Sequence, residues 1–263
     1  MDIIFPEYQN PIIARAISKY NSTHPKSHIN PIKVDGLESA LRLLKNSQNT
    51  ALITGIDYTT RDVALACKHL VSTQDDSKMF SSCLVLHNDT PNHGLPKTII
   101  IADAGISKNP SVDQLETIVV QTYKTATKVL LGTPRIAMLS FSSFGSAKDS
   151  SIDKIQAVIT KIKSTHPEIL IDGEMQLDCA VDPKIADKKA PKNSPVAGHA
   201  NVLITPDLNS GNLLYKSLEK FGGYTAAGPI LQGFKKPISD LSRGSTIEDI
   251  VLTIETIVKV AEP

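Results

Sequence analysis

The sequence has no excess of charge of either sign: Lys and Arg number 28 against 27 for Asp and Glu, a formal net charge of +1. Such a chain offers no broad basic face to a polyphosphate backbone, so we expect no nucleic-acid partner. It also lacks an apolar run of membrane-spanning length, and MDIIFPEYQN reaches an acid and a proline before any leader-like region develops. We therefore expect a cytoplasmic protein that binds no membrane.

Cysteine is scarce, and metal-binding motifs are missing. The three cysteines, Cys67, Cys83 and Cys179, are far apart and form no CxxC, which indicates neither a disulfide framework nor a zinc site. We expect buried thiols of a reducing compartment. There is no HExxH, and the histidines of HPKSH at 24–28 flank a proline in a polar stretch. We interpret them as solvated surface and predict no metal.

Nucleotide-binding motifs are missing as well. GSAKDSS contains a lysine but not the Gly-Lys-Ser/Thr order of a phosphate-binding loop, and no GxGxxG occurs. Nucleotide hydrolysis and dinucleotide-dependent redox chemistry are therefore not favoured.

What is present is an alternation of short β-branched apolar runs with longer amphipathic stretches, a pattern that predicts the α/β class. With 263 residues and 41% hydrophobic content, the chain can build one large or two modest cores. Helices are expected at 111–131, where Ser111 and Gln114 form a capping box, at 213–221, and from 247 onward. The expected strands are Ile3–Phe5, Ala51–Thr54, Ser82–His87, Thr98–Ala102, Arg135–Phe141, Ile169–Ile171 and Asn201–Ile204.

Three of the expected strands end in similar loops, at 52–62, 138–148 and 203–212, each rich in Gly and in hydroxyl or amide residues and followed by a helix. In open α/β sheets such loops lie at the carboxyl ends of strands, where backbone N–H groups attract anions. Jointly they could hold phosphate. The alternative is that these residues are only good turn and cap formers.

A cluster of carboxylates, Asp172, Glu174 and Asp178, lies in DGEMQLDCAV. Paired carboxylates could do acid–base chemistry. Turn and cap hydrogen bonds are the alternative use of acidic residues after a strand, and we slightly favour that interpretation.

The stretch PISDLSRGSTIED precedes the last helix and contains two possible capping boxes, Thr246 with Asp249 and Ser245 with Glu248. We expect that Ser245, Thr246 and Glu248 suffice to start the helix and leave Asp249 available for chemistry.

Capping does not account for Arg243, because a cation near the positive end of a helix dipole is locally unfavourable. An anion between Arg243 and the helix N-terminus would remove that cost, and Gly244 would let the backbone approach it closely.

Several long, ordered motifs resemble the phosphate acetyltransferase family: ADAGISKNPSVDQL, RIAMLSFSSFGSAK, ILIDGEMQLDCAV, SPVAGHANVLITPDLNSGNLLYK and GPILQGFKKPISDLSRGSTIEDIV. The resemblance covers roughly residues 80–263. It implies two α/β/α domains with mostly parallel sheets, like the isocitrate and isopropylmalate dehydrogenases, an active-site cleft between the domains, and a homodimer. Domain I would comprise 1–76 and 232–263, and domain II 77–231.

The resemblance also implies an activity, the reversible transfer of an acetyl group between acetyl phosphate and coenzyme A, with no cofactor. Arg243 would bind the phosphoryl group and stabilise charge on the acyl carbonyl, Ser242 would hydrogen-bond the tetrahedral species, and Asp249 would take the thiol proton. The expected substrate-binding residues are Thr59, Thr60, Arg61, Ser140, Ser142, Ser143, Asn209, Ser210, Gly211, Asn212 and Gly233.

The chain departs from this family in domain I. Family members are longer between IIFPEYQNP and LITGIDYTTRD, where they carry a substrate-binding arginine without a counterpart here. A second family arginine aligns with Leu65, and only Arg61 is near. These departures favour one alternative, a non-catalytic homologue that binds acyl-CoA or acyl phosphate. A transferase for a longer acyl chain is a second alternative, and a dehydrogenase a remote third.

Overall fold

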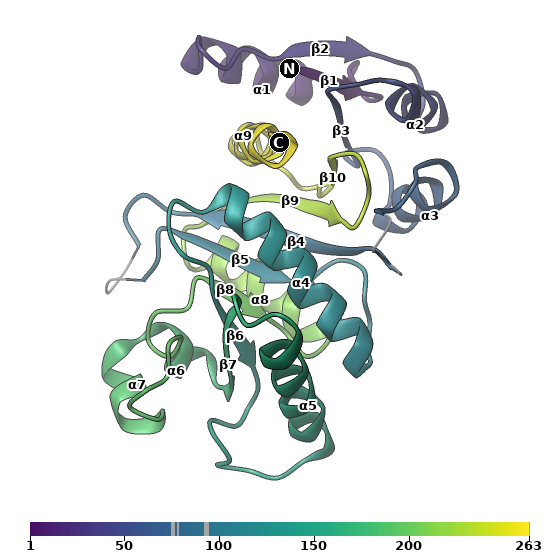
Figure 1. Ribbon diagram of the computed structural model, residues 1–263. Coiled ribbons are helices and arrows are strands. Elements are labelled where there is room, and N and C mark those ends of the chain that lie inside the picture. Colours follow the sequence, from purple (N-terminus) through teal and green to yellow (C-terminus); the bar gives the residue numbers. More distant parts are fainter. Residues whose placement is uncertain (75–76, 78, 92–94, 263) are drawn as a thin grey trace. The chain divides into compact units, whose positions relative to one another are not determined.

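The computed structural model describes residues 1–74, 77, 79–91 and 95–262. The chain forms two compact units (Figure 1): unit 1 comprises Met1–Phe80 and Thr225–Pro263, and unit 2 comprises Ser81–Tyr224. The domain boundaries expected from the sequence, after residues 76 and 231, stay a prediction. The first falls among residues 75–78, of which the structure describes only Ser77.

Unit 1 contains a mostly parallel sheet in the order β2-β1-β3-β10-β9. Strands β2, β1, β3 and β10 run parallel, and β9 is antiparallel to β10. The register places Asp2 opposite Thr50 and Asp240 opposite Thr54. The strands are β1 Asp2–Phe5, β2 Asn30–Lys33, β3 Thr50–Thr54, β9 Thr225–Gln232 and β10 Ile238–Asp240.

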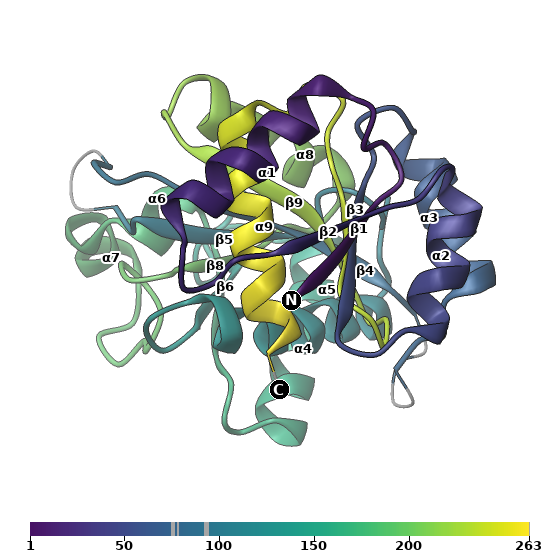
Figure 2. The ribbon, with the colours of Figure 1, turned by 90° about the horizontal axis from the view of Figure 1, so that it is seen from above.

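Helices cover both faces of this sheet (Figure 2), with α1 and α9 packed together on one side and α2 and α3 on the other. They bury apolar stripes such as Ile250, Ile254 and Ile257 of α9, which are fully buried. The helices are α1 Pro11–Thr23, α2 Leu37–Asn46, α3 Thr60–Leu70 and α9 Ile247–Ala261.

Unit 2 contains a sheet in the order β4-β5-β8-β6-β7. Strands β5, β8, β6 and β7 run parallel, and β4 is antiparallel to β5. The strands are β4 Ser81–His87, β5 Thr98–Ala102, β6 Arg135–Leu139, β7 Leu170–Met175 and β8 Val202–Ile204. In Figure 1, α4 and α5 lie in front of these strands and α8 behind them. The helices are α4 Val112–Val129, α5 Ser150–Thr165, α6 Leu177–Val181, α7 Pro183–Lys189 and α8 Leu208–Lys220.

The predicted α/β class is confirmed, and each predicted strand and helix is present with ends shifted by a few residues. Ser111 and Gln114 form the predicted capping box at α4. The three cysteines are free and buried, as expected. Strands β2, β9 and β10 were not predicted. In the described part of the chain, none of the helices is both long and apolar enough to span a bilayer.

Candidate active site

The carboxyl ends of β1, β3 and β10 lie at one edge of the unit 1 sheet because these strands are parallel. Helices α1, α3 and α9 follow these strands in the chain, so each begins at this edge. The backbone N–H groups of a first helical turn have no partner within the helix and carry a partial positive charge. The starts of α1, α3 and α9 therefore gather at this edge of the sheet. We call it the unit 1 edge.

Glu7, just after β1, holds this edge together from inside. Its carboxylate accepts hydrogen bonds from the Thr54 hydroxyl at 2.9 Å and from the backbone N–H groups of Gly55 at 2.9 Å and Asp57 at 3.1 Å. Burial raises the pKa of Glu7, and these three hydrogen bonds oppose that rise. Glu7 thus fixes the loop that leads from β3 into α3.

Asp240, the last residue of β10, is a second buried carboxyl group at the unit 1 edge. It is fully buried, and neither of its oxygens has a hydrogen-bond partner in acceptable geometry among the described residues. Burial raises its pKa to about 7, with the Thr60 side chain lowering it and the charge of Glu7 raising it. Near neutral pH, Asp240 is therefore poised between its protonated and ionised forms.

The loop after Asp240 carries two of the predicted catalytic residues. Its first amide, that of Leu241, donates to the carbonyl of Thr54 at 2.5 Å and so continues the pairing with β3. Ser242 is half-buried and its hydroxyl accepts a bond from the Gly244 amide at 3.3 Å. Arg243 is exposed and has no ion-pair or hydrogen-bond partner among the described residues. Gly244 has no left-handed backbone angle that would require glycine.

Of the two possible capping boxes, that of Thr246 with Asp249 is confirmed, and the expectation that Asp249 takes no part in capping is wrong. The cap of α9 is Thr246, and Asp249 itself completes the capping box: its Oδ2 accepts bonds from the amide and the hydroxyl of Thr246, each at 2.8 Å. Its Oδ1 accepts a bond from the Ala226 amide at 3.1 Å. Asp249 is only 6% exposed, so it is a structural carboxylate of the α9 cap.

Thr59, Thr60 and Arg61 lie at the start of α3, also on the unit 1 edge. Thr59 is the N-cap, and its hydroxyl accepts from the Asp62 amide at 3.2 Å. Arg61 is exposed and has no partner among the described residues. Leu65, the position aligned with a family arginine, lies one turn later on the same helix face and is 46% exposed.

Gly233 lies away from these residues. It follows β9, which is antiparallel to β10 with Leu231 opposite Ile238. Its end of the sheet is therefore the opposite edge, where its carbonyl accepts a bond from the Gln74 amide at 2.8 Å. The structure does not bring Gly233 beside Arg243.

In unit 2, the loop at 140–147 follows β6, and we call it the serine loop. It is anchored by Glu174. The Glu174 carboxylate accepts hydrogen bonds from the Ser142 hydroxyl and the backbone amide of Gly145, each at 2.8 Å. It accepts a third from the side-chain amide of Gln156 at 2.5 Å. Burial raises the pKa of Glu174, but these hydrogen bonds outweigh burial and hold that pKa below its ordinary value. This favours the structural interpretation of the DGEMQLD carboxylates.

The serine loop leaves one of its predicted binding residues open to a ligand. The Ser142 hydroxyl is occupied by Glu174, and the Ser143 hydroxyl accepts from the Gln176 amide at 3.0 Å. Ser140, whose hydroxyl accepts a bond from the backbone amide of Ser142 at 3.3 Å, lines a pocket of about 440 Å³.

That pocket lies over the carboxyl ends of β6 and β8, between the serine loop and the start of α8. Asp207, the N-cap of α8, accepts from the amide of Ser210 at 2.8 Å and from its hydroxyl at 3.1 Å. The lining of the pocket combines apolar with polar side chains. The residues are Asn109, Leu139, Ser140, Phe141, Ser151, Lys154, Ile155, Leu177, Thr205, Pro206, Asp207, Ser210 and Leu214.

The other predicted residues of α8 surround the same helix start. Asn209 is exposed and Asn212 half-buried, and neither side chain has a hydrogen-bond partner in the described residues. Gly211 is buried: a Cβ built there would lie 2.5 Å from the Asp103 carbonyl oxygen and 2.8 Å from Thr205 Oγ1. Gly211 thus permits close packing of α8 on the loop after β5.

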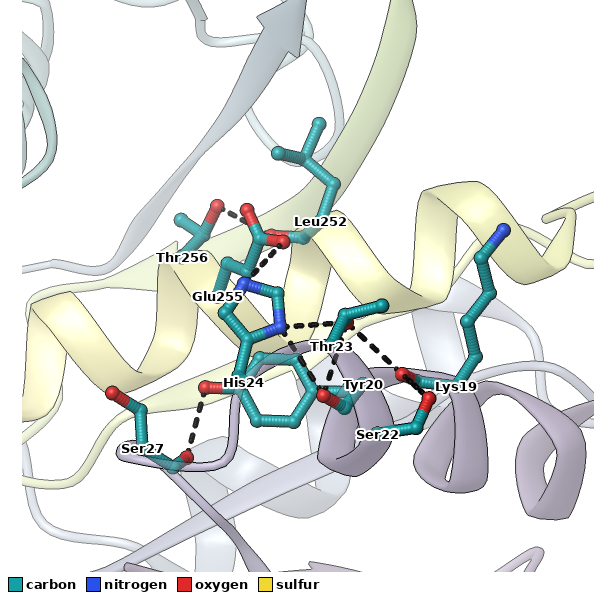
Figure 3. Close-up of polar contacts among 9 residues, drawn as sticks. All are labelled: Lys19, Tyr20, Ser22, Thr23, His24, Ser27, Leu252, Glu255 and Thr256. Atoms are coloured by element: carbon teal, nitrogen blue, oxygen red, sulfur yellow. Dashed lines mark hydrogen bonds and ion pairs between the residues drawn. The ribbon is translucent and has the colours of Figure 1, made fainter.

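Groups that could hold a metal are missing from the described residues, where no cluster of three His, Cys, Asp or Glu side chains occurs. The interpretation of the two HPKSH histidines as solvated surface is confirmed for His28, which is exposed, and wrong for His24, which is half-buried. Its ring stacks on Tyr20 with centroids 4.4 Å apart, and Nε2 lies 3.3 Å from Glu255 Oε1 (Figure 3). The contact joins the end of α1 to α9.

The chain resembles known proteins in its amino-acid sequence. The model of the phosphate acetyl/butaryl transferase family matches residues 6–258. The chain belongs to that family. A phosphate acetyltransferase of Clostridium acetobutylicum is 41% identical over 217 residues, which are 82% of this chain but only 65% of that protein. The matched part is thus less than two thirds of that relative's length.

Solved structures agree in fold. A phosphotransacetylase from Streptococcus pyogenes matches with a TM-score of 0.80 at 28% identity, covering 99% of this chain and 93% of that one. A branched-chain phosphotransacylase from Enterococcus faecalis matches with a TM-score of 0.81 and covers 100% and 99%, and at 21% identity it speaks for the fold alone.

Proposed function

We propose that this chain is a phosphate acetyltransferase, which reversibly transfers an acetyl group between acetyl-CoA and phosphate to give acetyl phosphate and CoA. The observation that carries the proposal is the arrangement of two side chains at the unit 1 edge. There Arg243, without any partner in the described residues, precedes the start of α9, and the ionisable Asp249 lies one turn later. Membership in the family supports the same reaction.

In the direction that forms acetyl-CoA, the CoA thiol attacks the acetyl carbon of acetyl phosphate. A free thiol with a pKa near 8.5 is mostly protonated at neutral pH, so a base must accept its proton. Asp249 would do so through Oδ1, because each carboxylate oxygen has two acceptor positions and Oδ1 uses one, for Ala226. Both positions of Oδ2 are taken by Thr246.

Arg243 would bind the phosphoryl group and stabilise the negative charge that develops on the carbonyl oxygen, and the Ser242 hydroxyl would donate to that oxygen. Phosphate then leaves as the tetrahedral species collapses to the thioester. In reverse, a phosphate oxygen attacks the thioester carbon and the leaving thiolate recovers its proton from Asp249. No enzyme-bound acyl group and no cofactor are needed.

Within unit 2, the pocket fits the arm of CoA, a chain of methylenes interrupted by amides. Leu139, Phe141 and Leu177 would cover the methylenes, while Ser140 and Ser210 would meet the amides. We propose the side-chain amides of Asn209, which is exposed, and Asn212, which is half-buried, as further contacts. By family resemblance we also propose a cytoplasmic homodimer without nucleic-acid or membrane partners. Light scattering of the purified protein tests the dimer.

The test of the activity is phosphate-dependent release of free thiol from acetyl-CoA. We expect turnover by the wild type and a loss of about 10²- to 10³-fold in kcat for Arg243→Ala. Arg42→Ala is the matched control, because Arg42 is an exposed arginine that pairs with Glu38 on α2. Folded protein that releases no thiol from any short acyl-CoA contradicts the proposal.

A second candidate function is supported by Leu65, which stands exposed where the family resemblance implies an arginine. The chain would then bind acyl-CoA or acyl phosphate without turnover and act as a regulatory homologue. Calorimetric binding of acetyl-CoA in the absence of thiol release would select this function. Faster turnover of butyryl-CoA than of acetyl-CoA would instead indicate a transferase for longer acyl chains.

A further inference from the structure

Helices α1 and α9 lie against each other and run in the same direction. Lys19 Nζ lies 2.7 Å from Glu248 Oε1, and five residues later His24 pairs with Glu255. In Figure 3 both helices advance the same way, from Lys19 to Thr23 in α1 and from Leu252 to Thr256 in α9. The two contacts define how residues of α1 align with residues of α9.

This alignment places Arg15 beside the loop that carries Arg243. Arg15 precedes Lys19 by one turn and shares its helix face. One turn before Glu248, the contact of Lys19, the chain is at Gly244, within the loop between β10 and α9. Arg15 is exposed, and no described residue pairs with it.

Arg61 lies at the same unit 1 edge, in the first turn of α3. The start of α1 is tied to the loop before α3, because the Asn10 side-chain amide donates to Asp57 Oδ1 at 3.3 Å. The loop before α9 is tied to the same segment by the bond from Leu241 to Thr54. Thus three arginines that lack a partner among the described residues belong to this edge: Arg15 in α1, Arg61 in α3, and Arg243 in the loop before α9.

The acidic side chains of the unit 1 edge are engaged by other groups. Glu7 is bound by backbone amides, Asp57 by Asn10, and Asp62 by the Thr59 hydroxyl at 2.7 Å. Glu248 pairs with Lys19, and Asp249 serves the cap of α9. The remaining acid, Asp240, is fully buried. Each of these acids thus has another partner or is buried, and among the described residues none of them pairs with Arg15, Arg61 or Arg243.

We propose that Arg15 is a phosphate-binding residue, which together with Arg61 and Arg243 forms a three-arginine site for the phosphate or phosphoryl group of the substrate. The proposal rests on the proposed function, and it supplies the cationic contacts that the shortened domain I had left unassigned. A guanidinium presents two parallel N–H donors to phosphate oxygens, which suits three arginines to one tetrahedral anion.

The experiment compares Arg15→Ala and Arg15→Lys with Arg42→Ala as the control. Hydrogen bonds to charged groups contribute about 1.5–3 kcal/mol, so we expect the KM for phosphate of Arg15→Ala to rise about 10- to 100-fold. The KM for acetyl-CoA should change by no more than about twofold, because Arg15 contacts phosphate alone. Arg15→Lys should recover part of the loss.

A second measurement needs no turnover: the rise in melting temperature that inorganic phosphate causes, at constant ionic strength. We expect this rise in wild type and in Arg42→Ala, and its loss in Arg15→Ala. If thiol release is absent but this pattern holds, the proposed function fails and the phosphate site stands. Unchanged phosphate KM and unchanged stabilisation in Arg15→Ala overturn the site while leaving the transferase intact. A wild type that phosphate does not stabilise also overturns it.

Discussion

Asp249 Oδ1 accepts a hydrogen bond from the backbone amide of Ala226 at 3.1 Å, which ties the first turn of α9 to the start of β9. The other oxygen of the same carboxylate caps α9 through Thr246. The Asp249 side chain therefore ties the start of α9 both to its own cap residue and to β9. The same bonds fix the orientation of the carboxylate, including the acceptor position of Oδ1 that is still free. Such preorganisation is what a catalytic base requires.

Replacing Asp249 by Asn should separate its two roles. The side-chain amide nitrogen of Asn would face an N–H donor, so we expect a stability loss of about 1–2 kcal/mol. If Asp249 is the base that we propose, its loss should also lower kcat by about 10²–10⁴. Urea unfolding and thiol release measure the two effects. Thr246→Ala, which removes only the cap hydroxyl, should lose about 1 kcal/mol and keep kcat within a few-fold. Equal losses of activity in both variants would show that Asp249 acts only through the cap.

Asp240 should make stability depend on pH. Its pKa is raised from 3.8 to about 7 by burial, so the folded state keeps a proton that the unfolded state has lost between these values. Stability then falls as pH rises, by up to about 1.4 kcal/mol per pH unit. Asp240→Asn should remove this slope, which urea unfolding at several pH values between 4 and 7 can measure. Parallel pH profiles for the two proteins would refute the assignment.

Glu174→Gln should loosen the serine loop. The variant loses the charge that three donors stabilise, so we expect a loss of about 1–3 kcal/mol in the free energy of unfolding at neutral pH. The pKa of Glu174 is lowered in the folded state, so the carboxylate's contribution is present above its ordinary pKa and disappears as pH falls below it. The difference between the proteins should shrink in acid. Glu168→Gln, on the surface, is the control and should change little.

Gly211→Ala tests whether that glycine is needed for packing. Its Cβ would collide with the Asp103 carbonyl and the Thr205 hydroxyl, and we expect a loss of about 1–3 kcal/mol from overpacking. Gly132→Ala is the matched control, because a Cβ there meets no atom within 4 Å. Thermal unfolding measures both, and a Gly211→Ala protein as stable as wild type would exclude close packing at α8.

Local patterns predicted most elements of the fold. The buried run Ala51–Thr54 and the Ser111 capping box are recognisable without any tertiary contact, because strand and cap signals lie within a few residues. Strands β9 and β10 were missed for a physical reason. A Gly-Pro pair interrupts the strand pattern within β9. The three-residue β10 is too short to show a pattern of its own, and it is held by pairing with β9 and with β3, which is far away in the sequence.

The sequence by itself determined the α/β class, seven of the strands, the helices α4, α8 and α9, the family, and the presence of an arginine that capping does not explain. Only the tertiary structure decided that Asp249 caps its own helix, that Gly233 lies at the far edge of the unit 1 sheet, and that α1 packs against α9 with Lys19 beside Glu248. The reason is that parallel pairing of β1, β3 and β10 brings the ends of distant segments to one edge. No pattern within one segment encodes which other segments share that edge.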